Sequence, residues 1–469
     1  MEDYAALGFK AGIEIHQQLD GEKLFCSCPS LIRKDDPQFV VRRKLRLSSS
    51  EEGGVDNAAA YEKQKNKDFV YQGYEGTTCL VELDEEPPHP INAEALLAVT
   101  TVAKLLHCTL VDQVQFMRKM VIDGSNVSGF QRTALIGYNG YFELHGKRIA
   151  IETICLEEEA SQAVSRSEKQ DIYNLSRQGI ALIEIATGPD FSSADEVRDG
   201  AAYLGMVLRS TPTCKRGIGS IRQDVNISIK GHPRVEIKGF QDIKSMKKII
   251  DYEVDRQRKE KKGTSHVRKA TAELTTEYLR PMPGADRMYP ETDVPILSLP
   301  HVEQLPVLLT EKIAMFEKTY GLSKDFAEMA VDLETKETID VGRLFKKYAR
   351  VDPKTILSLY VVLPKEISRK LQQEVSVTSY AQELLDLLQA NKLATSSLAQ
   401  IIEAKAKGED VDFSAFRPVS EADVKKIIAQ VVAKNKGAPF GALMGLCMKE
   451  LGGKVDGKLL SSLLKKEVA

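Results

Sequence analysis

The chain has 469 residues, of which 42% are hydrophobic, and its 65 basic and 67 acidic side chains give a formal net charge of −2. A chain of this length normally folds as several domains, each large enough to bury its own core. Because the net charge is close to zero, the overall electrostatic field does not draw the protein to nucleic acid, and any RNA contact must come from local basic patches.

Seven cysteines, an odd number in a long chain rich in lysine and glutamate, argue against a secreted protein held together by disulfides. The N-terminal residues MEDYAALGFK lack the basic segment and apolar run of a secretory signal, and no apolar stretch approaches the roughly 18 residues of a membrane span. We therefore expect a cytoplasmic protein that is neither exported by that route nor inserted in a membrane.

Residues 1–295 predict an α+β domain with a largely antiparallel sheet. Short runs typical of strands, such as residues 148–156 and 179–186, are separated by Gly, Pro and Asn turns. Helical composition or spacing occurs elsewhere in this domain, at residues 93–107 and 194–210.

The first predicted strand carries two polar side chains on one face. In GIEIH, Glu14 and His16 alternate with apolar residues, so they lie on the same side of the strand about 7 Å apart. A solvated surface pair explains this pattern as well as a functional site does, and the strand alone does not decide between them.

Two further groups of carboxylates follow in predicted strands. Glu184 shares its face with Ile180 and Leu182, and a buried carboxylate costs several kcal/mol unless it has a partner. The run Glu157-Glu158-Glu159 closes another strand; it is either a solvated strand end or a source of metal ligands, and alternation does not choose between Glu157 and Glu158.

Two later strands also have one apolar and one polar face. Asp224 and Asn226 share a face in DVNISI, and Glu236 and Lys238 share one in VEIKGF. Solvent exposure or a cross-strand ion pair would account for these residues. Glu, His and Asp together are nevertheless the side chains that hold a hard divalent cation with one imidazole ligand.

The chain changes character after the proline-rich residues 280–300, and helical patterns dominate from there on. We expect a helical domain at 296–394, with helices within 302–320, 325–332, 353–363 and 380–392, and a helical tail domain at 395–469. In the tail, Ser420 with Asp423 three residues later predicts a capped helix start, and GKLLSSLLKKEVA predicts the last helix.

Other motifs are weak or absent. Cys26 and Cys28 form a C-x-C pair with Cys79 as the only plausible later partner, which is not the spacing of a structural zinc site, so zinc is not expected. The sequence contains neither a P-loop nor the G-x-G-x-x-G or G-x-S-x-G patterns, so it does not resemble a Rossmann enzyme or a hydrolase.

Several segments, taken together, resemble the B/E subunit family of tRNA-dependent amidotransferases. They are GFKAGIEIHQQLDGEKLFCSCPS, ICLEEEAS, YNLSRQGIALIEIATGPD, GSIRQDVNISIKG, VEIKGFQDI, RPMPGADRMYPETDVP and ALMGLCMKELGGKVDGKLLSSLLKKE. The resemblance spans nearly the whole chain. It implies a ligase that uses ATP and Mg²⁺ to phosphorylate tRNA-bound glutamate and then aminates it with ammonia from an asparaginase-like or amidase-like partner subunit.

The resemblance also assigns roles to residues. It implies a cradle-shaped catalytic domain whose metal ligands are Glu14, His16, Glu157 and Glu184, which favours Glu157 over Glu158. It further implies a group that binds nucleotide or the aminoacyl end of the tRNA, consisting of Arg222, Asp224, Asn226, Glu236 and Lys238. The tail is expected to contact tRNA phosphates through Lys454, Lys458, Lys465 and Lys466.

Within the family, these segments are most similar to those of the archaeal E subunit. The bacterial B subunit completes a zinc site with a later C-x-x-C, whereas only Cys79 stands here. The archaeal form usually carries an inserted domain resembling aspartyl-tRNA synthetase, and this chain has only the short residues 258–274 at that place.

Two other functions are open on the sequence alone. A non-catalytic tRNA-binding scaffold would have no use for a costly carboxylate at Glu184. A free-standing carboxylate-amine ligase acting on a small acid would need neither tRNA nor a helical tail.

Overall fold

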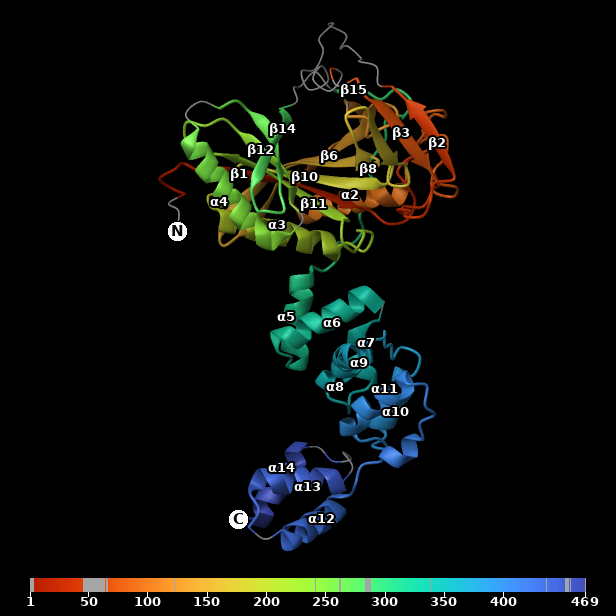
Figure 1. Ribbon diagram of the computed structural model, residues 1–469, viewed down its shortest axis with the longest axis vertical. Coiled ribbons are helices and arrows are strands. Elements are labelled where there is room, and N and C mark those ends of the chain that lie inside the picture. Colours follow the sequence, from red (N-terminus) through yellow and green to blue (C-terminus); the bar gives the residue numbers. More distant parts are fainter. Residues whose placement is uncertain are drawn as a thin grey trace. The chain divides into compact units, whose positions relative to one another are not determined.

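The structure, a computed structural model, describes residues 4–44, 64, 66–121, 123–240, 242–260, 263–282, 288–337, 339–435, 437–451, 455 and 457–468. The chain divides into two compact units, Met1–Leu308 and Leu309–Ala469 (Figure 1). The first is rich in strands and the second is helical, so the expected α+β domain followed by a helical region is confirmed. The expected boundaries at 295 and 394 remain predictions.

Within the described residues, the main sheet of the first unit has eleven strands, in the order β14-β13-β12-β11-β1-β10-β7-β6-β5-β15 with β4 beside β6. All described neighbours in it are antiparallel except β12 and β13. Its strands are β1 (Lys10–Gln18), β4 (Thr109–Leu110), β5 (Phe116–Met120), β6 (Phe130–Leu144), β7 (Lys147–Glu158), β10 (Ala181–Thr187), β11 (Ile221–Ser228), β12 (Val235–Phe240), β13 (His266–Ala270), β14 (Thr276–Pro281) and β15 (Met288–Pro290).

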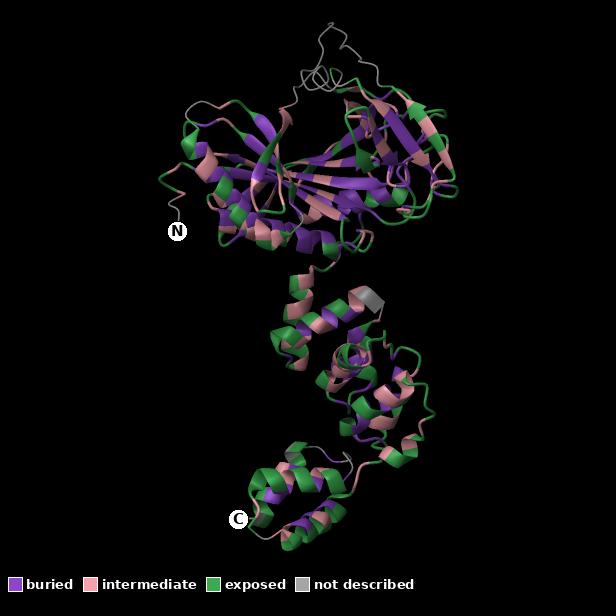
Figure 2. Ribbon diagram, in the orientation of Figure 1, coloured by how far each residue is buried: buried purple, intermediate pink, exposed green. Residues whose placement is uncertain are grey.

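Three helices cover one face of this sheet: α2 (Ala93–Leu105), α3 (Ala194–Ser210) and α4 (Ile243–Lys259) (Figure 1). On the apolar side of β1, Ile13 and Ile15 are buried. The central strands of the first unit are largely purple, the colour of buried residues, in Figure 2. The helix predicted at 194–210 is confirmed, and the Ser193 side chain caps it by accepting from the Glu196 N–H. The helix predicted at 93–107 ends at Leu105, because His107 adopts a left-handed φ of 54°.

A second sheet stands beside the main one and has four described strands in the order β2-β3-β9-β8. They are β2 (Phe39–Arg43), β3 (Asp68–Gly73), β8 (Gln162–Arg166) and β9 (Gln170–Asn174). Its buried Tyr71 donates a hydrogen bond to the carbonyl of Gly124, and Tyr173 donates one to the carbonyl of Asp123. These bonds fix the turn between β5 and β6, which borders the site described below.

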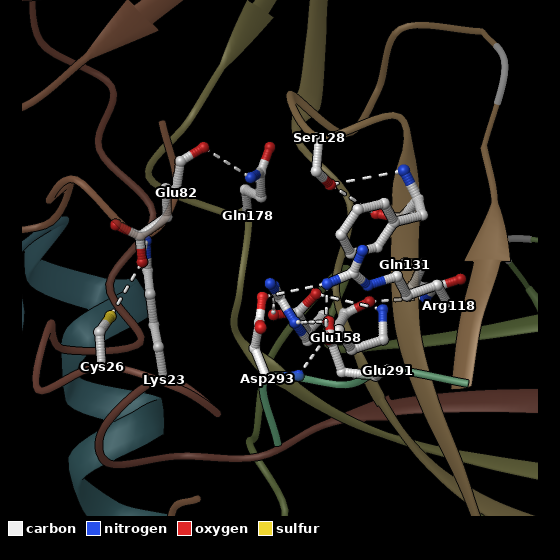
Figure 3. Close-up of polar contacts among 12 residues, drawn as sticks. Lys23, Cys26, Glu82, Arg118, Ser128, Gln131, Glu158, Gln178, Glu291 and Asp293 are labelled. Carbon is white, nitrogen blue, oxygen red and sulfur yellow. Dashed lines mark hydrogen bonds and ion pairs between the residues drawn. The ribbon is translucent and has the colours of Figure 1, made fainter. Parts of the chain in front are cut away.

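A buried carboxylate ties the far edge of the main sheet together. Glu291, directly after β15, is 1% exposed and accepts from Arg118 of β5 at 2.6 Å and from Arg132 of β6 at 2.8 Å (Figure 3). Arg132 also donates to Glu158 at 3.1 Å. Because two guanidinium groups share this one carboxylate, its negative charge stabilises both of them in the folded protein.

The second unit contains only helical elements in its described part. They are α5 (Leu309–Tyr320), α6 (Lys324–Glu337), α7 (Val341–Lys347), α8 (Pro353–Leu357), the π-helical turn η1 (Ser358–Val362), α9 (Leu363–Leu371), α10 (Ala381–Gln389), η2 (Thr395–Ser397), α11 (Leu398–Ala406), η3 (Phe413–Phe416), α12 (Glu421–Lys434), α13 (Phe440–Glu450) and α14 (Gly457–Val468).

Buried apolar side chains of the second unit form one hydrophobic cluster from Phe316 to Ile402 and another from Val424 to Leu464. The predicted cap at Ser420 is confirmed, because its hydroxyl accepts from the Asp423 N–H. The helix expected from residue 302 begins only at Leu309, since Pro306 disfavours a helical residue before it and lacks an N–H. Among the described residues, no helix is long and apolar enough to span a membrane.

The Glu291 linkage gives a prediction about stability. We expect Glu291→Gln to lower the free energy of unfolding by about 3 kcal/mol, since it leaves two guanidinium groups sharing a neutral partner in a buried place. Urea denaturation of the full chain measures this. The control is Glu277→Gln, which removes an exposed carboxylate of β14 that pairs with Lys269 of β13, and it is expected to leave the midpoint unchanged. Equal midpoints for both variants would show that Glu291 is not a structural tie.

Candidate active site

The strand register places the predicted site residues on one face of the main sheet. Across antiparallel strands, directly opposed residues share a face. His16 of β1 lies opposite Glu184 of β10, and Glu14 lies opposite Asp224 of β11. One strand further, Leu182 lies opposite Glu157 of β7. The face opposite to the helices therefore collects carboxylates from four neighbouring strands.

Three of these side chains form a compact group, here called the metal cluster: Glu14, His16 and Glu184. Their donor atoms all lie within 4.8 Å of one another. The His16 Nε2 atom is 3.4 Å from a Glu14 oxygen and 3.2 Å from a Glu184 oxygen. Since the Glu184 side chain is only 15% exposed, a freely solvated carboxylate is excluded, and the expectation that it has partners is confirmed.

Glu157, the fourth predicted ligand, joins the cluster through a lysine. It is fully buried and contacts the ammonium group of Lys119, which is also 3.5 Å from Glu184. Thr133 and Gln131 of β6 donate to Glu157 at 2.8 and 3.1 Å. The Glu157-Glu158-Glu159 run is buried throughout, so the interpretation of a solvated strand end is wrong: each carboxylate has cationic partners that repay its burial.

The carboxylates of this cluster and His16 shift one another's pKa values. Burial, reinforced by Glu184, raises the pKa of Glu14 to about 7, and burial with Glu184 also raises the pKa of Glu157. Against the effect of burial, Lys119 and His16 lower the pKa of Glu184. Burial acts to lower the pKa of His16, but Glu184 and Glu14 raise it to about 9. The carboxylates are crowded enough to compete for positive charge.

The donor set fits Mg²⁺. Carboxylate oxygens with a single imidazole suit a hard divalent cation better than a thiophilic one. Glu14, His16 and Glu184 are the residues that would hold it, with Glu157 next to them.

The metal cluster forms part of the wall of a cavity of about 500 Å³. The turn between β5 and β6, strand β8, and the ends of β11, β12 and β14 provide the other walls. Positively charged side chains also stand in the lining: Lys119, Arg166, Arg177, Arg222, Lys238 and Arg280. A cavity with both carboxylates and several cations can bind a metal ion and an anionic ligand together.

The residues predicted to bind nucleotide or the aminoacyl end are divided by the structure. Arg222, Asp224 and Lys238 line the cavity, whereas Asn226 and Glu236 are absent from its described lining. Lys238 donates to Asp224 at 2.7 Å and lies 2.5 Å from Glu236, so the cross-strand ion pair considered above is present.

Two of the lining cations carry no recognisable signal in the sequence. Lys119 lies in a five-residue strand, FMRKM, without clear alternation. Arg177 lies in the loop after β9. Only the pairing of distant strands shows that Lys119 reaches Glu157.

A second group of possible metal ligands lies apart from this cluster. The thiols of Cys26, Cys28 and Cys79 and the carboxylate of Glu82 lie within 4.8 Å of one another. Cys26 donates to Glu82 at 2.9 Å, and the buried Lys23 ammonium is 3.2 Å from the same carboxylate (Figure 3). Three thiols with one carboxylate form a donor set that zinc accepts, and Glu82 was missed because C-x-x-E is not a zinc spacing. The expectation that zinc is not bound remains a prediction.

The predicted tRNA-binding lysines are described only in part. Lys465 and Lys466 are exposed in the last turns of α14. Lys458 belongs to α14, but its side chain is not described, and Lys454 lies outside the described residues.

Comparison with known proteins identifies the family of this chain. The GatB/GatE catalytic domain matches residues 9–303, and the GatB domain matches residues 344–468. The chain is similar to proteins named as the E subunit of glutamyl-tRNA(Gln) amidotransferase. It is 32% identical to that of Methanococcus maripaludis and 34% identical to that of Archaeoglobus fulgidus, with 99% of each chain covered in both pairs. The relative of Methanosarcina acetivorans is 33% identical, with 99% of this chain and 98% of the relative covered.

These alignments are much longer than the chain itself. The first extends over 628 positions, although the chain has 469 residues, so many residues of the relative have no counterpart here. A missing inserted domain produces such a difference in length. The two domain matches and the relatives that align over almost the whole chain show that this protein belongs to the GatB/GatE family.

Proposed function

We propose that this chain is the subunit of a glutamyl-tRNA(Gln) amidotransferase that activates tRNA-bound glutamate with ATP and then converts it to the amide. The observation that supports this most directly is the group of Glu14, His16, Glu157 and Glu184 on one sheet face, in a cavity that also holds several cations. The names of the relatives indicate the substrate, and the side chains of the cavity indicate the kind of reaction.

The reaction needs two bond exchanges. The side-chain carboxylate of glutamate is a poor acceptor for ammonia, so one of its oxygens first attacks the γ-phosphorus of ATP while the bond to the β-phosphate oxygen breaks and ADP leaves. Ammonia then attacks the acyl carbon, the bond to phosphate breaks, and the nitrogen loses a proton. The products are ADP, phosphate and glutaminyl-tRNA.

Phosphoryl transfer depends on positioning and charge neutralisation more than on covalent help from the protein. Mg²⁺, when bound, neutralises phosphate charge at the metal cluster. The chain holds the remaining parts in place: Lys119 fixes Glu157 and Glu184, and the two flanking glutamates orient the imidazole of His16. Since these side chains project from strands of one sheet, their spacing is set before any substrate binds.

Ammonia and tRNA imply partners. Because neither the motifs nor the described site offers an amide-hydrolysing centre, we infer a hetero-oligomer in which an asparaginase-like or amidase-like subunit releases ammonia. We also infer that the complex works in the cytoplasm and that the lysines of α14 contact tRNA phosphates.

A scaffold protein and a free-standing ligase fit the observations less well. A scaffold would not need three carboxylates and an imidazole that compete for cations. A ligase for a small acid would not need the helical unit. The names of the relatives, which specify a tRNA substrate, also do not fit such a ligase.

Changing one metal-cluster carboxylate tests the activity. We expect Glu184→Gln to lower tRNA-dependent ATP hydrolysis at least 100-fold, because a neutral amide contributes no negative charge to a bound cation. Phosphate release from Mg-ATP, with glutamyl-tRNA(Gln) and the partner subunit present, measures this. The control is Glu152→Gln, which changes an exposed glutamate of β7 and leaves the rate unchanged. Full hydrolysis by Glu184→Gln would refute the metal-site assignment.

Removing two cations from α14 tests the tail. We expect the pair Lys465→Ser and Lys466→Ser to weaken tRNA binding about tenfold and to make it less dependent on salt, because each lysine releases counterions from the RNA. Filter binding at several salt concentrations measures both effects. The matched control changes Lys318 and Lys324, exposed lysines of the same unit. If both double variants bind tRNA alike, the tail does not have this role.

A further inference from the structure

A buried carboxylate beside the metal cluster holds two arginines at the cavity wall. Glu159 is 1% exposed, and one of its oxygens accepts from Arg222 at 2.7 Å and lies 4.0 Å from the Nε atom of Arg177. Gln18 donates to its other oxygen at 3.1 Å. Both guanidinium groups therefore converge on one fixed anchor.

The arginines are held differently. Arg177 also donates to the carbonyls of Ala160 and Ser161, at 2.8 and 2.7 Å, so three backbone or carboxylate groups determine its place. The Arg222 side chain is 39% exposed, and both arginines line the cavity. A guanidinium carries five N–H donors, so one bond to Glu159 leaves Arg222 with donors to offer a ligand.

This group is adjacent to the metal cluster. Arg222 lies directly opposite His16 across strands β11 and β1. Glu159 follows Glu157 by two residues, about 7 Å along an extended chain. A ligand held by the two arginines would therefore be next to the atoms that accept the cation.

The charges on the two sides of the metal cluster differ. On one side, Arg177 and Arg222 share the single carboxylate of Glu159, which leaves one positive charge in excess. On the other side, Lys238 is shared by two carboxylates, Asp224 and Glu236, which leaves one negative charge in excess. Of these two groups, the arginine group is the one with a net positive charge to attract an anion.

We propose that Arg177 and Arg222, aligned by Glu159, form a clamp that binds the polyphosphate of ATP beside the metal cluster. Planar guanidinium groups match phosphate oxygens in a bidentate manner, which lysine cannot do. The clamp rests on the proposed ATP-dependent function, and it adds Arg177 and Glu159, which no pattern in the sequence indicated for this role. In it, Arg177 and Arg222 touch the phosphates, while Glu159 is a positioning residue that acts through them.

Direct binding measurements test the clamp. The full-length chain is titrated with Mg²⁺ and a non-hydrolysable ATP analogue, and separately with glutamyl-tRNA(Gln). We expect Arg222→Lys and Glu159→Gln each to raise the Kd of the analogue about tenfold or more, with the Kd of the charged tRNA unchanged within about twofold. The control is Arg198→Lys, which changes a partly buried arginine of α3 outside the cavity lining.

Steady-state kinetics separate positioning from a purely structural role. Glu159→Gln is expected to raise the KM for ATP while kcat at saturating ATP stays near that of the unchanged protein. If Glu159→Gln does not fold, Arg222→Lys, whose replaced side chain is partly exposed, still tests the clamp through the Kd of the ATP analogue.

Two results would overturn the clamp. Weaker binding of charged tRNA with unchanged nucleotide binding would assign these arginines to the glutamate carboxylate, and no change in either would make the group structural. A chain that, with its partner, neither binds nor hydrolyses ATP would refute the proposed function itself. A hydrolysing chain with unaffected arginine variants would refute the clamp alone.

Discussion

The site depends on the register of one strand. β1 lies between β10 and β11, and its pairing sets His16 opposite Glu184 and Glu14 opposite Asp224. Because side chains alternate, a slip of one residue would turn both polar side chains toward the helices and expose Ile13 and Ile15. The buried apolar face of β1 against α3 therefore fixes the metal cluster as well as the core. Hydrophobic burial on one side of the sheet specifies the chemistry on the other.

The same face concentrates charge that a protein interior normally excludes. Buried carboxylates are costly, and here each one has a cation: Lys119 for Glu157, Arg222 for Glu159, and Lys238 for Asp224. Glu14 and Glu184 both pair with His16, and Glu184 also lies 3.5 Å from the ammonium group of Lys119. Negative charge that exceeds its cationic partners is thus found at the metal cluster and at the neighbouring Asp224 and Glu236, which share Lys238, and a cation held by the metal cluster would stabilise it.

Local patterns in the sequence predict much of the fold but not its long-range pairing. Alternation and helical spacing predicted β7, β10 and α3, and the Ser420 cap was recognisable from four residues. Glu14, His16 and Glu184 could be suspected because each stands at a polar position of an otherwise apolar strand. Lys119 could not be found, because its significance comes from β6 and β7, which bring it to Glu157. Glu82 likewise acquires meaning only where two loops meet.

A site of this kind explains why no compact motif announces it. Each strand contributes one or two residues, so the residues of the cavity floor are scattered from position 14 to position 238 while the sheet holds them rigidly together. The opposite wall has a different origin, since Tyr71 and Tyr173 of the second sheet hold the turn at Gly124 by its carbonyls. These hydrogen bonds run from buried side chains to backbone carbonyls of the turn, so they position the turn without depending on its own side chains. The charged side chains of the floor are therefore constrained one by one, because each needs its partners. The wall is constrained mainly in shape, so its side chains can vary more freely and determine which substrate the cavity accepts.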